Sequence, residues 1–93
     1  MTIFEQISLR IIKEQALIIG PVAWAEAKKV SGLKVDQEKG EVIIEGDSKD
    51  VINGLVNQYA RLFGRASNEV CKEAVQDLLA ELPKEQIPSH LIG

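Results

Sequence analysis

The chain has 93 residues, of which 45% are hydrophobic and 27% are charged, as expected for one small globular domain. Its formal net charge of −3 disfavours nonspecific binding to nucleic acid or to an anionic membrane. Its single cysteine excludes an intrachain disulfide and fits a cytoplasmic protein. Charged residues interrupt the apolar N-terminal segment, so we expect neither a signal peptide nor a membrane span.

The first expected element is a helix over residues 1–19, which is more apolar than a surface helix needs to be. Apolar residues occupy two of its sides: Ile3, Ile7, Ile11 and Ile18 on one, and Leu9, Ile12, Ala16 and Ile19 on the other. Two apolar sides indicate either a central core helix or a helix that packs on a second protein. We therefore predict a homodimer with this helix as the leading interface. The expected interface residues are Ile3, Phe4, Ile7, Ile11, Ile18 and Trp24.

A corner at Gly20-Pro21 is expected to separate the first helix from an Ala-rich second helix over Pro21–Ser31. Trp24 lies just beyond this corner. Its side chain fits equally well as an anchor in a protein interface and as a cover for the core of the domain.

The spacing of apolar residues then changes from that of a helix to alternation with polar residues, which predicts a β-hairpin within residues 33–46. Its expected strands are Leu33–Asp36 and Glu41–Glu45, with Gly40 in the turn at a positive φ. A lone two-stranded hairpin is marginal in water, so it must pack on helices or pair with a strand of another chain.

A helix pair is predicted over residues 48–82, with Asp47 or Ser48 capping its first helix and Gly64 ending it. The second helix is expected from about Asn68 to Leu82, with Ser67 as its cap, in an antiparallel hairpin. Tyr59 and Phe63 are assigned to the core. The apolar tail, residues 84–93, is expected to dock, with a turn from Pro88. The predicted fold is a single α+β domain over residues 1–93, mostly helical, in the order α-α-β-β-α-α.

No pattern of catalytic residues, metal ligands or cofactor-binding residues is recognisable, so we predict none of these sites. His90 is the only histidine and is expected at the surface, while Cys71 lies on an apolar helical face and is expected in the core. Glycines occur singly at the ends of elements and form no phosphate-binding loop.

Two segments carry a resemblance to a known family: residues 19–23, which read IGPVA, and residues 78–83, which read LLAELP. Together they resemble the small helical "IGP(I/V)A" accessory domain of bacterial, notably cyanobacterial, signalling proteins. The match spans about Leu17 to Leu91, and the hairpin departs from the pattern. The resemblance implies a noncatalytic domain that contacts other proteins in a signalling system.

The function expected from the sequence is therefore a non-catalytic, cytoplasmic protein-interaction or regulatory module, acting as a homodimer and contacting another signalling protein. One alternative is a small DNA-binding regulator that uses the 51–82 helix pair, although Glu69 and Glu73 would face phosphates. The other is a small enzyme or ligand-binding protein whose site forms at a dimer interface.

Overall fold

The computed structural model describes residues 1–92 and confirms the predicted α+β, mostly helical fold class. The elements follow in the order α1 (Ile3–Ile19), α2 (Val22–Ala27), β1 (Leu33–Asp36), β2 (Glu41–Ile44), α3 (Ser48–Phe63) and α4 (Ala66–Leu79). Two short 3-10 helices complete the described chain, at Lys84–Gln86 and Ser89–Leu91.

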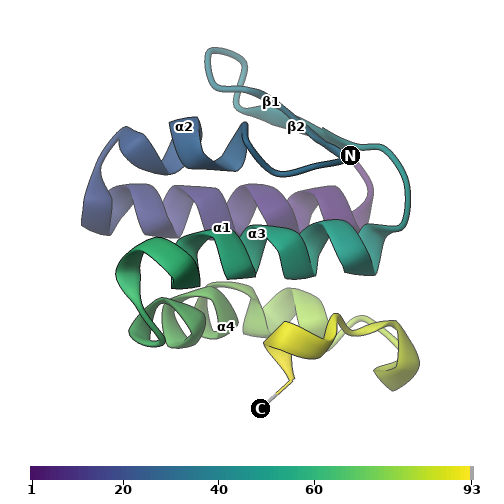
Figure 1. Ribbon diagram of the computed structural model, residues 1–93. Coiled ribbons are helices and arrows are strands. Elements are labelled where there is room, and N and C mark those ends of the chain that lie inside the picture. The colour runs from purple at the N-terminus through teal and green to yellow at the C-terminus, as the bar shows by residue number, and fades with distance from the viewer. Residues whose placement is uncertain (93) are drawn as a thin grey trace.

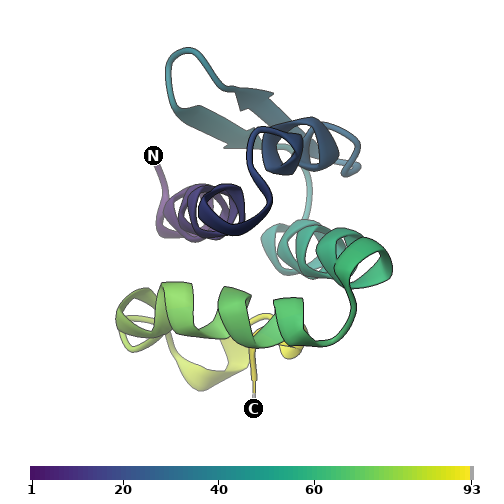
Figure 2. The same ribbon diagram turned by 90° about the vertical axis from the view of Figure 1, so that its left-hand side faces the viewer.

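Helix α1 lies at the centre of the molecule, and α2, β2, α3 and α4 all pack on it. In Figure 2, α1 and α3 are seen almost along their axes, with α2 and the hairpin above them and α4 below. Ile7, Ile11 and Ile12 have no exposed surface, and Leu9 is also buried. Of the two roles that the apolar first helix allowed, α1 therefore has that of the central core helix.

Helix α4 crosses beneath both α1 and α3, whereas the sequence predicts an antiparallel hairpin of α3 and α4 (Figure 2). The prediction was wrong because the short link at Gly64 keeps the two helices adjacent but does not fix the angle between them. Ser67 was also wrong as a cap, since it lies inside α4, where its hydroxyl donates to the Gly64 carbonyl at 2.9 Å. The hairpin of β1 and β2 and the Asp47 cap of α3 are confirmed.

Glu5 joins the start of α1 to the hairpin. Its carboxylate accepts hydrogen bonds from the Thr2 backbone N–H at 3.0 Å and from the Ile44 backbone N–H at 3.0 Å. The Thr2 hydroxyl in turn accepts from the Glu5 N–H at 3.1 Å, which completes a capping box. Because the Ile44 N–H lies on the edge of β2, Glu5 also occupies part of that edge, where a strand of another chain would have to pair.

Two polar contacts fix α2 against α3. The buried Tyr59 hydroxyl donates to the Ala23 carbonyl at 2.7 Å, and burial raises the pKa of Tyr59. The Glu26 carboxylate accepts from Gln58 at 2.8 Å and from Lys29 at 3.1 Å, and these bonds hold the pKa of Glu26 below its usual range. A helix as short as α2 is unstable alone, so these contacts hold it in place.

The tail docks on the helices, as predicted, and its turn follows Pro88. Pro88 and Leu91 are buried. Asn53 of α3 accepts from the His90 backbone N–H at 2.9 Å and donates to the Ser89 hydroxyl at 3.2 Å. The expected docking of Gly93 lies outside the described residues.

The Glu5 contacts predict a pH-dependent contribution to stability. The hydrogen bond from Ile44, followed by that from Thr2, lowers the pKa of Glu5 below its ordinary value of 4.5. The stabilisation that the ionised Glu5 provides is therefore complete above pH 4.5. It is lost as the pH falls through the lowered pKa of Glu5 in the folded state. We expect Glu5→Gln to lower the free energy of unfolding by about 1 kcal/mol at neutral pH, measured by urea denaturation.

The difference between Glu5→Gln and the wild type should shrink below pH 4.5, because the protonated carboxyl no longer serves as a charged acceptor. Glu38→Gln, at an exposed position in the hairpin turn, provides the matched control and should leave stability unchanged. A Glu5→Gln effect of the same size at every pH would contradict the role given to the ionised carboxylate.

Candidate functional site

The predicted interface residues do not form one surface. Ile7 and Ile11 were wrongly placed there, since they have no exposed surface and face other elements of the same chain. The remaining four are Ile3, Phe4 and Trp24, which are half-buried against the core, and Ile18, which is 62% exposed. Trp24 thus covers the core of the domain, and only Ile18 projects well into solvent.

Large apolar side chains are instead exposed where α1 and α3 end and α2 begins. We call Leu17, Ile18, Val22, Leu62 and Phe63 the helix-end surface. Leu17 is the most exposed of them, at 81%. The C-terminal ends of α1 and α3 lie at the same end of the molecule, on the left in Figure 1. Phe63, which the sequence assigns to the core, is 42% exposed, whereas Tyr59 is buried as predicted.

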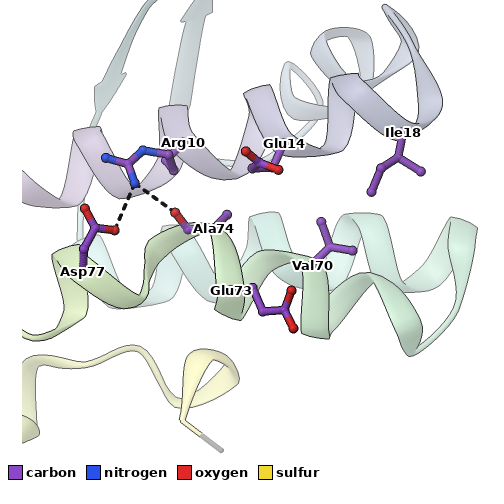
Figure 3. A pocket seen from close by; sticks show the side chains of 7 residues that line it. All are labelled: Arg10, Glu14, Ile18, Val70, Glu73, Ala74 and Asp77. Atoms are coloured by element: carbon purple, nitrogen blue, oxygen red, sulfur yellow. Dashed lines mark hydrogen bonds and ion pairs between the residues drawn. The ribbon is translucent and has the colours of Figure 1, made fainter.

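A groove of about 360 Å³ runs between α1 and α4 and leads toward the helix-end surface (Figure 3). Helix α1 contributes Arg10, Glu14 and Ile18 to its walls, and α4 contributes Val70, Glu73, Ala74 and Asp77. Ile18 and Val70 point toward each other across the groove at its apolar end. The charged side chains lie along the rest of its length.

A smaller pocket of about 130 Å³ adjoins this groove and shares Ile18 and Val70 with it. The other lining residues are Gln15, Ile19, Phe63, Ala66 and Ser67, so most of the lining is apolar. Gln15 is buried and donates to the Ser67 carbonyl at 3.3 Å, which ties α1 to α4 beside the pocket. The pocket is smaller than the roughly 300–1,000 Å³ of typical small-molecule sites and suits a single side chain.

The charges of the groove are unequally paired. Arg10 donates to the Asp77 carboxylate and to the Ala74 carbonyl, each at 3.0 Å, and the Asp77 bond lowers the pKa of that carboxyl (Figure 3). Glu14 and Glu73 form no ion pair with any of residues 1–92. The groove therefore presents unneutralised negative charge one helix turn from its apolar end.

The residues with reactive side chains lie apart from this groove's surface. Cys71 is buried, as predicted, and burial raises the pKa of its thiol while a hydrogen bond from Gln15 at 3.5 Å opposes the shift. His90 is half-buried on the docked tail, with its ring Nδ1 3.3 Å from the Ser89 hydroxyl. Within residues 1–92, no three His, Cys, Asp or Glu side chains are grouped so that they could hold a metal ion.

Comparison of the chain with known protein families, with curated proteins and with solved structures gives no match. The resemblance to the bacterial accessory domain stays a prediction. Of the helices between residues 1 and 92, none has the length and apolar character required to cross a bilayer.

The burial of Cys71 predicts slow thiol chemistry. Because the thiolate is the reactive form and the thiol is buried with a raised pKa, Cys71 should react with a disulfide reagent far more slowly in the native protein than in urea. Absorbance of the released thiol measures the rate. Native labelling as fast as that of the unfolded chain would contradict the buried position and would favour an exposed reactive site.

Proposed function

We propose that the chain is a non-catalytic, cytoplasmic protein-interaction domain with a regulatory role, and that it associates with a second copy of itself through the helix-end surface. The observation that carries this proposal is the exposure of Ile18 and Phe63, which line an apolar pocket, together with that of Leu17, the neighbour of Ile18 in α1. Exposed apolar side chains that gather around a pocket are typical of surfaces that another protein covers.

The energetics favour association through such a surface. Complete burial of one large aliphatic side chain contributes about 1.5–3 kcal/mol, and the domain exposes several at this end. The entropy lost on association offsets part of this gain, so the net free energy is that of a reversible complex. The regulatory role rests on the resemblance of residues 19–23 and 78–83 to the signalling accessory domain.

DNA binding is less favoured. Helix α4, which would serve as the recognition helix, exposes Glu69, Glu73 and Asp77. Its lysine, Lys72, is half-buried and lies 3.4 Å from the Glu69 carboxylate. Carboxylates on the outer side of this helix would repel the phosphates of a bound duplex.

The proposal predicts that Ile18→Glu weakens self-association without unfolding the domain, since Ile18 is 62% exposed. Light scattering over a dilution series measures the mass of the wild type and of the variant, and circular dichroism verifies the fold. We expect a dimer for the wild type and a folded monomer for Ile18→Glu.

The matched control is Ile43→Glu, because Ile43 is 56% exposed and lies on β2, away from the helix-end surface. This control should keep the wild-type mass. A wild type that stays monomeric at every concentration would contradict self-association, and equal effects of the two variants would contradict the choice of surface.

A further inference from the structure

We propose that the groove between α1 and α4 receives helix α1 of a second copy of this chain, with Leu17 of each copy in the apolar pocket of the other and Lys13 facing the groove's carboxylates. This inference rests on the proposed self-association and specifies how the two copies meet. It follows from two observations: the side chains that would fill the groove, and the place on α1 where the chain carries such side chains.

The groove requires an aliphatic side chain and a cation about one helix turn apart. Its pocket, between Ile18 and Val70, fits one side chain. Glu14 precedes Ile18 by one turn of α1, and Glu73 follows Val70 by about one turn of α4. Both carboxylates lack an ion pair within residues 1–92, while Asp77 is already held by Arg10. A helix with this pattern would match the groove in both shape and charge.

Helix α1 carries this pattern on its open side. Leu17 is the most exposed large apolar side chain of the described residues, and Lys13 precedes it by one turn, is exposed and has no ion-pair partner among residues 1–92. Both residues are offset by about 100° around the helix from Glu14 and Ile18, which line the groove. The side of α1 that docks on the second copy therefore lies next to the side that lines the groove.

The order of these residues sets the direction of the docked helix. In the groove the carboxylate Glu14 precedes the pocket residue Ile18, and in the docked helix Lys13 precedes Leu17. The second α1 therefore runs in the same direction as the first. A two-fold axis between the two helices and parallel to them places Leu17 of each copy in the pocket of the other. The contact therefore closes at a dimer.

Charge reversal tests this arrangement on the intact chain. Lys13→Glu and Glu73→Lys should each raise the dimer dissociation constant about tenfold, because each places like charges at the contact. The double variant Lys13→Glu/Glu73→Lys should bind more tightly than either single variant, since one opposite-charge contact is restored with its signs exchanged while Glu14 keeps its negative charge. Analytical ultracentrifugation over a dilution series gives the constants, and circular dichroism verifies that each variant is folded.

The matched control reverses exposed charges away from the groove, with Lys28→Glu and Glu38→Lys, and should leave the constant unchanged. Leu17→Ala should weaken the dimer at least about tenfold, whereas Ile43→Ala should not. Failure of the double variant to recover affinity overturns the proposed docking. If the double variant fails but Ile18→Glu still abolishes the dimer, self-association through the helix-end surface stands and only the docking of α1 in the groove is rejected. A monomeric wild type overturns both.

Discussion

The burial of the apolar side of α1 by its own chain is the constraint on which the rest of the structure depends. Ile7, Ile11 and Ile12 have no contact with solvent, and α2, β2, α3 and α4 each cover part of the helix. Several of these elements are not stable alone, since α2 has only six residues and the sheet only two strands. They fold because α1 offers them an apolar surface, and they in turn remove the apolar side of α1 from water.

Apolar packing alone does not fix how these elements are positioned, and a few polar contacts do so. Glu5 joins the first turn of α1 to β2, Gln15 joins α1 to the start of α4, and Tyr59 joins α3 to α2. A buried donor or acceptor that loses its partner costs about 1–3 kcal/mol, so alternative packings that break these bonds are disfavoured. Of these contacts, that of Gln15 ties α1 to α4 beside the pocket.

The sequence predicts what depends on local signals. Gly20 and Gly64 mark the ends of α1 and α3, Asp47 caps α3, and the alternation around Gly40 predicts the hairpin to within a residue. It does not predict which apolar residues of α1 are covered, because a core helix and an interface helix share one pattern. The crossing of α4, the exposure of Phe63 and the meeting of α1 with α4 depend on contacts between residues far apart in the chain. The only local signal of the exposed end is the apolar last turn of both helices, just before their terminal glycines.

The central claim is that α1 is protected by its own chain rather than by a partner, and amide hydrogen exchange tests it most directly. The account predicts that, in protein diluted to monomer, the amides of Ile7, Ile11 and Ile12 still exchange only through global unfolding, with a protection that matches the monomer's own free energy of unfolding. Exchange of these amides in the folded monomer that is much faster than its global unfolding allows would show that a second copy covers this helix, and would contradict the account.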